Sequence, residues 1–494
     1  MKKHIFFVVA MLCWLILALP ALDIRGGLLF TAQTDAAKPT TTSRSLWGGF
    51  VGSVYQKLGD FEFLWSARVD NEGKYPQEAL AGLSGTLSYY AEDSGLRYSH
   101  DGIGITLGKF ANYDMIDSPY SLFVSSAGNQ AMMGEISLER GTFFYTDRWV
   151  GLNHNLQSGL YYTASDKDLW PCSTKTQENL YRDRGLVLKT FGLRFGRLRI
   201  GYQDALLYTG QYFNIDAFAI PAPGWLVQYA ASAAGRPWTS ASDMNSLMGF
   251  FADYTEDSWY VYGQVLVDDV NLDPILDPSA QNYAPNKLAA SLGGRLDTTA
   301  GTFGLYLAGA TRYTFESVRN EFYSYTYYPG SAVISEDALV GIPMEDLMIG
   351  YINGENNFAA MLTWKKAFPI ATINSSLEFK LTGAQSPANP WHDQVGFTSS
   401  DWFRWLDDPV LEKKLTLKLG ASRSFGRMTV WAKATVGYVW NRLALESVTA
   451  ADSDTDSNGE YLTEADGSEP YWRPSDQSTW FGAISVGLKY SFTP

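Results

Sequence analysis

The chain has 494 residues, 18% of them charged and 15% aromatic, and a formal net charge of −14. This length is enough for a large core or for more than one domain, and the acidic balance argues against nucleic acid as a partner. The mean hydropathy is slightly negative, which excludes a bundle of membrane helices.

The chain begins with a segment typical of a secretory signal peptide. Lys2 and Lys3 form a basic start, residues 5–19 form an unbroken apolar run, and Ala21 offers a small residue for cleavage. The apolar run is shorter than the roughly 20 residues that a spanning helix needs. We therefore predict a signal peptide at 1–21.

The exported part, predicted at 22–494, is one barrel domain that keeps a single cysteine, Cys172. It can form no intrachain disulfide. Cys13 would suit a lipoprotein site, but the apolar run continues past it. Cleavage by a signal peptidase is the preferred interpretation.

Polar and apolar residues alternate along the exported chain, as they do in strands with one apolar face. In the last such segment, Trp480, Ile484 and Val486 share one face, and Ser485 and Lys489 share the other. In chain order, strands are predicted near 46–55, 60–69, 82–90, 103–110, 134–146, 185–204, 248–255, 258–267, 286–296, 302–313, 357–366, 371–383, 413–422, 427–441 and 480–492.

These segments run to about ten residues, whereas strands of globular proteins average nearer five or six. A tilted strand needs about nine to eleven residues to cross a membrane. The length therefore favours a membrane barrel with its apolar face toward lipid over a secreted sandwich, the alternative, in which that face would be core.

The connections fall into two sizes, as in outer-membrane barrels with short periplasmic turns and long external loops. Tight connections are predicted at 71–74, 254–258, 297–301 and 424–428, and long ones at 164–183, 206–247, 268–285, 314–346, 384–412 and 443–477. The alternation is expected to fail once, between Met348 and Ile370. The fold predicted is all-β: a transmembrane antiparallel β-barrel of about 16–18 strands in the outer membrane of a diderm bacterium.

The last strand ends in an aromatic residue, Phe492, followed by Thr493 and Pro494. An alternating strand ending in an aromatic resembles the C-terminal signal by which barrels are recognised for insertion. The barrel-insertion machinery and outer-membrane lipid are therefore expected partners.

The middle of the chain resembles the Wzi-type capsule-assembly outer-membrane barrels. The resemblance rests on "YGQVLVDD" within 248–274, on "NKLAASLGG" within 286–314 and on the style of 182–210, and it covers roughly 130–380. It implies a monomeric barrel of about 18 strands that helps to hold acidic capsular polysaccharide at the cell surface.

No catalytic constellation is evident, and we predict that the protein is not an enzyme. Ser99, His100 and Asp101 are neighbours whose side chains alternate between faces, so they cannot form a relay. His154 and Ser158 are four residues apart, about 13 Å along a strand, which is too far for a hydrogen bond.

Two features of the predicted external loops suggest binding. Asp454, Asp456, Asn458 and Glu460 stand in an acidic stretch that resembles the first half of a calcium loop. The closing glutamate is absent, and an ordinary solvated loop is the alternative. Flat aromatic rings suit the apolar faces of sugars, or they pack loops onto the barrel rim; the candidates are Trp391, Trp402, Trp405, Tyr471 and Trp472.

The polar faces of the strands are rich in lysine and arginine, whereas the loop at 443–477 is acidic. If those faces line a lumen, an acidic protein encloses a basic interior that favours anions. The residues predicted to bind a ligand there are Arg295, Arg312, Lys380, Lys414, Lys418 and Lys433. Two functions remain open: a barrel that attaches or assembles acidic surface polysaccharide, and a porin-like channel for anionic or sugar solutes.

Overall fold

The computed structural model describes most of the exported chain. The described residues are 23–39, 43–74, 82–84, 87–154, 183–232, 244–271, 285–316, 324–327, 344–384, 402–446 and 471–492. The predicted signal peptide, Trp391 and the predicted calcium residues Asp454, Asp456, Asn458 and Glu460 lie outside them.

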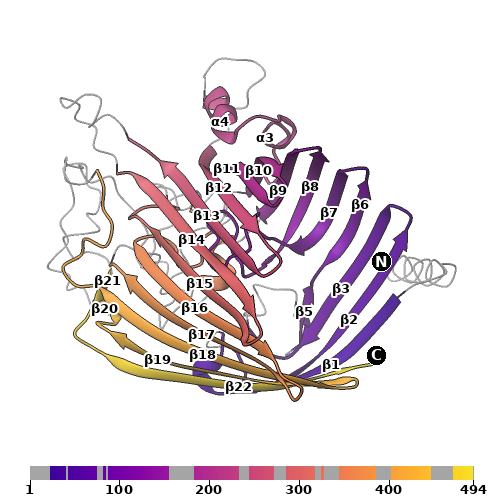
Figure 1. The fold of residues 1–494 in the computed structure, drawn as a ribbon, viewed down its shortest axis with the longest axis vertical. Coiled ribbons are helices and arrows are strands. Elements are labelled where there is room, and N and C mark those ends of the chain that lie inside the picture. The colour runs from indigo at the N-terminus through magenta and orange to yellow at the C-terminus, as the bar shows by residue number, and fades with distance from the viewer. Residues whose placement is uncertain are drawn as a thin grey trace.

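A single antiparallel sheet closes on itself to form a barrel (Figure 1). The strands are β1 (Asp23–Gln33), β2 (Leu46–Leu58), β3 (Phe61–Asp70), β4 (Gly82–Ser84), β5 (Leu87–Ala91), β6 (Ser94–His100), β7 (Ile103–Ala111), β8 (Gln130–Arg140), β9 (Phe143–Asn153), β10 (Arg184–Phe195), β11 (Leu198–Thr209), β12 (Met244–Thr255), β13 (Trp259–Asp269), β14 (Lys287–Thr298), β15 (Gly301–Ala310), β16 (Asn357–Ala367), β17 (Thr372–Thr382), β18 (Glu412–Phe425), β19 (Met428–Trp440) and β22 (Thr479–Ser491). A separate pair, β20 (Leu443–Glu446) and β21 (Tyr471–Pro474), lies outside this sheet.

The first and last strands close the barrel. Gly27 of β1 pairs with Ser491 of β22, and Gln33 pairs with Ser485. Both β5 and β6 pair with β3 and occupy one position, while β4 only flanks β5. The 20 strands of the sheet therefore make a wall of 18 positions, as predicted.

The apolar face of each strand points out of the barrel. On β13, Tyr260, Tyr262 and Gln264 face inward and are buried, whereas Val261 and Val265 of the opposite phase are each 45% exposed. On β22 the outward set of the alternation includes Trp480 and Ile484, exposed by 72% and 56%. Closure gives each strand position a hydrogen-bonded neighbour on both sides, which is how strands can span lipid.

Short turns and long connections alternate without a break. The short turns are 59–60, 101–102, 141–142, 196–197, 256–258, 299–300, 368–371 and 426–427, and β1 begins and β22 ends at the same rim as these turns. The long connections therefore share the opposite rim, the external one in our interpretation.

Two sequence expectations about the connections are wrong. The predicted failure between Met348 and Ile370 does not occur, because 311–356 is one connection between the paired strands β15 and β16. Residues 71–74 do not form a tight turn, because β4 and β5 follow only at Gly82 and Leu87. They lie at the rim of the long connections.

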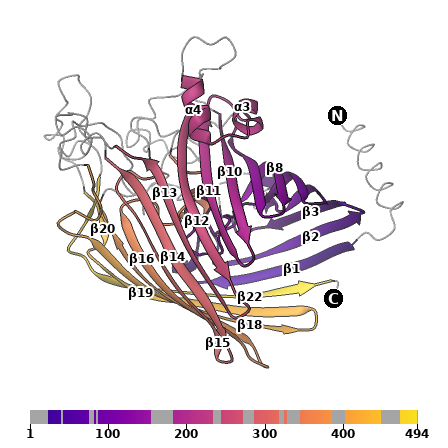
Figure 2. The ribbon, with the colours of Figure 1, turned by 45° about the horizontal axis from the view of Figure 1, so that its top comes forward.

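Helices are few and short. They are η1 (Asp35–Ala37), α3 (Ile215–Ala219), α4 (Gly224–Ser232) and α6 (Met344–Leu347). Of the helices in the described ranges, none has the length and apolar character needed to cross a membrane. Figure 2 shows α3 and α4 beside the ends of β10 and β11.

Candidate ligand-binding face in the lumen

The connection between β7 and β8, residues 112–129, folds into the barrel and fills part of its lumen. We call it the plug. Its side chains Tyr120, Leu122 and Phe123 are each no more than 1% exposed, and they belong to the main apolar cluster of the protein. The alternation of the strands does not predict the plug, although a run of apolar residues inside a loop is a signal for it.

The plug is fastened to the wall that carries β11 and β13. The Asp114 carboxylate accepts hydrogen bonds from the side-chain amides of Gln203 and Gln264 at 2.8 and 3.1 Å, and from the backbone N–H of Phe123 at 3.0 Å. The Gln264 carbonyl oxygen accepts in turn from the backbone N–H of Leu122 at 2.7 Å. These partners fix the backbone of the plug as well as its side chains.

The plug also reaches the opposite wall. The Tyr120 hydroxyl donates to the Glu378 carboxylate of β17 at 2.5 Å. Burial, and then the Glu378 charge, raise the pKa of Tyr120 above its ordinary value, so the phenol remains a donor. The plug therefore crosses the lumen from β7 to β17.

Beyond this contact lies a wall rich in lysine. Lys380, Lys414, Lys418 and Lys433 lie on the inward faces of β17, β18 and β19, and we call these four the lysine face. Lys380 and Lys414 are direct cross-strand partners, and Lys433 pairs with Gly420, two residues from Lys418. The alternation of polar and apolar residues in the sequence predicts that all four lie on the polar, inward face of their strands.

Within the described part of the chain, no member of the lysine face forms an ion pair. The Glu378 carboxylate on the same wall is engaged by Tyr120. Lys418 and Lys433 are exposed, and Lys414 is partly covered. The four ammonium groups outnumber the nearby carboxylates of Glu378 and Glu412, so the wall keeps a positive potential that attracts anions.

Aromatic rings stand beside these ammonium groups. Lys414 Nζ lies 4.9 Å from the ring centroid of Phe481, and Lys433 Nζ lies 5.4 Å from that of Trp431. Both rings project inward from the adjacent strands β22 and β19. The wall therefore combines positive charge with flat apolar surface, the two features that an acidic saccharide can use.

The other two predicted basic residues are placed differently. Arg295 faces the lumen, but it forms an ion pair with Asp117 of the plug and lies over the Tyr260 ring at 5.0 Å. Arg312 lies beyond the end of β15, is 5% exposed, and forms ion pairs with Asp407 and Asp408. The prediction that Arg312 belongs to the wall of the lumen is wrong, because it fastens one connection to another.

The described loop aromatics serve as packing groups. Trp402 donates from its indole N–H to the backbone carbonyl of Asn271 at 2.7 Å. Trp405 donates to the carbonyl of Asn357 at 3.0 Å. For Tyr471 and Trp472 the structure describes only the backbone of β21. A role of Trp402 and Trp405 in sugar binding stays a prediction.

The histidines form no relay among the described residues. His100 pairs with Asp60 at 2.9 Å and His154 with Asp183 at 2.6 Å, each at least half exposed at the ring. No group of three or more His, Cys, Asp or Glu in the described ranges could hold a metal ion. The absence of enzyme activity and the calcium site both stay predictions.

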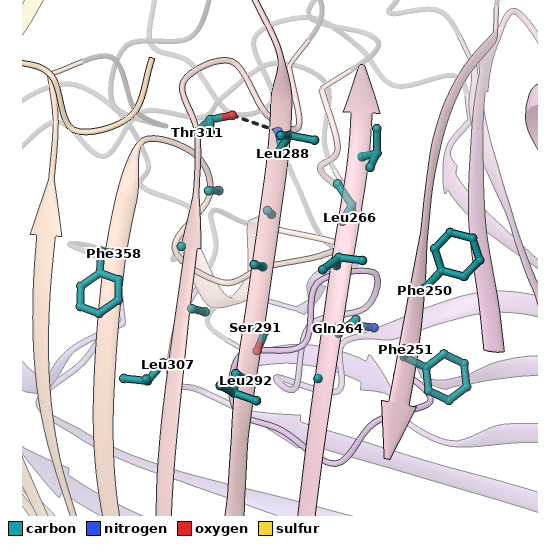
Figure 3. A pocket seen from close by; sticks show the side chains of 18 of the residues that line it. Phe250, Phe251, Gln264, Leu266, Leu288, Ser291, Leu292, Leu307, Thr311 and Phe358 are labelled. Carbon is teal, nitrogen blue, oxygen red and sulfur yellow. Dashed lines mark hydrogen bonds between the residues drawn. The ribbon is translucent and has the colours of Figure 1, made fainter. Parts of the chain in front are cut away.

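A separate groove of about 790 Å³ lies over β12–β16 (Figure 3). It is lined by outward side chains such as Phe250, Leu292, Leu307 and Phe358, and by Trp405 of the 402–410 segment. Small residues of the outward faces make its floor. The groove is almost wholly apolar and continues the outer belt, so it is no site for a charged ligand.

No protein-family model matches the chain, and no curated protein matches it. Among solved structures, it is similar to Wzi of Escherichia coli, an outer membrane protein involved in group 1 capsule assembly and a carbohydrate-binding β-barrel. The TM-score is 0.52 at 11% identity, over 99% of this chain and 88% of that chain. The chain has the fold of an outer-membrane β-barrel. The likeness to a Wzi-type barrel is thus confirmed for the fold.

Two outer-membrane proteins show weaker likeness. OccAB4 of Acinetobacter baumannii gives a TM-score of 0.43 at 9% identity, over 96% of this chain and 98% of that one. OprD of Pseudomonas aeruginosa gives 0.41 at 8% identity, over 95% of each chain. Neither value supports an argument about function.

Proposed function

We propose that this protein is an outer-membrane barrel that binds acidic surface polysaccharide on the lysine face of its lumen. The observation that carries the proposal is the set of four lysines on one inner wall without a carboxylate partner in the described residues. The similar Wzi barrel, which is involved in capsule assembly and binds carbohydrate, supports the same class of ligand.

The chemistry of the wall suits an acidic sugar polymer better than a small anion. Regularly spaced carboxylates of a polymer can meet several ammonium groups at once, so the affinity gains from multivalency. The rings of Phe481 and Trp431 offer stacking surface for the apolar faces of the sugar rings. A small anion would use the charges but not the rings.

The plug favours binding over transport. It crosses the lumen and is fastened at both walls, by Asp114 on one side and Tyr120 on the other. A channel for anionic or sugar solutes remains the alternative, and the exposure of Lys418 and Lys433 on the inner wall favours it.

The test compares two triple variants. Lys380→Gln, Lys418→Gln and Lys433→Gln together remove three charges from the lysine face and preserve its polarity. Lys413→Gln, Arg423→Gln and Arg427→Gln remove the same charge from exposed positions of the outward phase and of a short turn. Binding of polygalacturonate, a uronic acid polymer, is measured at low and at physiological salt, with neutral dextran as reference.

We expect the first variant to bind polygalacturonate about tenfold more weakly, a loss of about 1.4 kcal/mol, with a shallower salt dependence. The second variant should bind like the parent. Equal binding by both variants in correctly folded barrels would sink the proposal. Steady anion-selective current in planar bilayers, reduced only in the first variant, would replace it with the channel.

A further inference from the structure

Residues 210–232, which belong to a connection predicted as a long loop, form a folded structure on the outside of the barrel. We call this segment, with α3 and α4, the outer hairpin. Its Ala217 and Val227 pack on Trp149, Val187 and Leu206. Those three wall residues are cross-strand neighbours on the outward faces of β9, β10 and β11. Figures 1 and 2 both place α3 and α4 at the ends of these strands.

The hairpin covers the wall at membrane depth. It contacts Asp204, which is the seventh of the 12 residues of β11 counted from the short turn at 196–197. Ile200, in the same outward phase, is 39% exposed. An apolar band about 25 Å tall spans about nine to eleven residues of a tilted strand. Asp204 therefore lies within the band, in its outer half.

Charged side chains of the wall face outward under the hairpin. Asp147, Lys189 and Asp204 are on the outward faces of β9, β10 and β11, yet each is at most 4% exposed. Lys189 Nζ lies 3.8 Å from the Asp147 carboxylate. A lysine facing lipid costs about 2–4 kcal/mol near the midplane and an aspartate costs less, so these groups are favoured in a membrane wall when they are covered.

The covered charges satisfy the backbone of the hairpin at its bend. The ammonium group of Lys189 donates to the carbonyl oxygens of Ile220 and Ala222, and the carboxylate of Asp204 accepts from the N–H of Gly224 at 2.8 Å. The prolines Pro221 and Pro223 carry no N–H. Non-helical backbone at membrane depth requires this kind of internal partner.

The opposite side of the hairpin is apolar and exposed. Its exposed large side chains, with exposed fractions from 41% to 74%, are Phe213, Ile215, Ile220, Trp225, Leu226 and Tyr229. Asp216 is the single charged residue in the sequence 210–232. This surface is continuous with the belt on β10 and the nearby β12, where Leu193 and Phe250 are exposed by 39% and 62%. Such a surface marks contact with an apolar environment.

We propose that the outer hairpin is embedded in the outer leaflet and that its exposed face binds the acyl chains of outer-leaflet lipids. The occupant is hydrocarbon because six large apolar side chains stand on this face against one exposed carboxylate, that of Asp216, and because the face reaches membrane depth and continues the lipid-facing belt. Lys189 and Asp204 of the wall hold the hairpin there through hydrogen bonds to its backbone carbonyl and N–H groups. This inference is independent of glycan binding in the lumen.

The test places a fluorophore on the hairpin by way of cysteine. In a Cys172→Ser background, Leu226→Cys on the hairpin is compared with Leu292→Cys, a belt position that is 60% exposed, and with Asp257→Cys in a short turn. Each labelled barrel is folded into phosphatidylcholine vesicles with brominated acyl chains or with ordinary ones, and iodide serves as the aqueous quencher. Heat-modifiable migration verifies that each variant is folded.

We expect the brominated lipid to quench the probe at Leu226→Cys as strongly as at Leu292→Cys, and iodide to quench it at least about threefold less than at Asp257→Cys. Quenching by iodide as strong as at Asp257→Cys would place the hairpin in water and overturn the proposal. Protection from both quenchers would also overturn it, since a second protein copy rather than lipid would then cover the face.

Discussion

Glu355 is buried without any visible compensation. It is 1% exposed, and neither of its carboxylate oxygens has a hydrogen-bond partner among the residues that the structure describes. Burial first, and then the neighbouring Glu316, raise the pKa of Glu355 well above its ordinary value of 4.5. The residue lies in the connection 311–356, beyond the ends of the spanning strands.

This position predicts a specific pH dependence. Because the pKa of Glu355 is higher in the folded state, the folded state binds more protons, and the free energy of unfolding falls as the pH rises above about 4.5. Glu355→Gln keeps the shape and removes the ionisation. We expect it to raise the free energy of unfolding by about 1–3 kcal/mol near neutral pH and to change it little near pH 4.

Urea unfolding in detergent, measured at both pH values, checks this. Glu345→Gln, on an exposed side chain in the same connection, is the matched control and should leave the pH profile unchanged. A Glu355→Gln barrel with the parental slope against pH would contradict the prediction.

At the scale of elements, the side of the membrane on which the long connections lie can be tested by the accessibility of an inserted epitope to antibody. β22 must run inward to end at the rim of the short turns, so the connection 441–478 that precedes it should lie outside the cell. An epitope inserted after Ser457 should bind antibody on intact cells. The same epitope after Asp257, in the opposite rim, should bind only after permeabilisation; the reverse pattern would invert the topology.

The phase of the strands could be predicted from sequence, but not all of their ends could be. The predicted strands 134–146 and 185–204 each contain two strands joined by a turn of two residues. Gly141 and Gly196 have φ values of 61° and 60°, and each gives its turn the left-handed backbone that the tight reversal needs. Because the alternation continues through each two-residue turn, it does not reveal that the chain reverses direction there.

In the candidate site, too, the features set by local sequence could be predicted, and those set by contacts between distant residues could not. Lys380, Lys414, Lys418 and Lys433 share a face because alternation and register fix it. Arg312 instead forms an ion pair with Asp408, which lies 96 residues later in the chain. The local alternation of polar and apolar residues cannot predict that contact or the path of the plug.

At the scale of the whole molecule, closure depends on the ends of the chain meeting. The backbone N–H of Phe492 donates to Gly26 at 2.8 Å, and its ring lies 6.2 Å from that of Phe50. Replacing Phe492 and Tyr490 with Ala should slow closure and leave unfolded protein in the periplasm. The readout is heat-modifiable migration in outer-membrane fractions, with Trp480→Ala at the far end of β22 as the control; full insertion of the double variant would argue against a role in assembly.

The plug should determine the conductance of the barrel. Replacing residues 115–124 with a short Gly-Ser linker removes its apolar side chains and leaves the strands intact. We expect little current in planar bilayers from the parent and a steady current from the variant. A parent that already conducts as well as the variant would show that the plug does not block the lumen.

The route of the plug also sets an order of events during folding. Ser118 meets Tyr262, 144 residues later in the chain, and Tyr120 meets Glu378, 258 residues later. Contacts this distant in sequence form late. The lumen can therefore be filled only after most of the wall exists, so we expect a newly closed barrel to pass through a transiently empty, ion-permeable intermediate that seals itself as it matures.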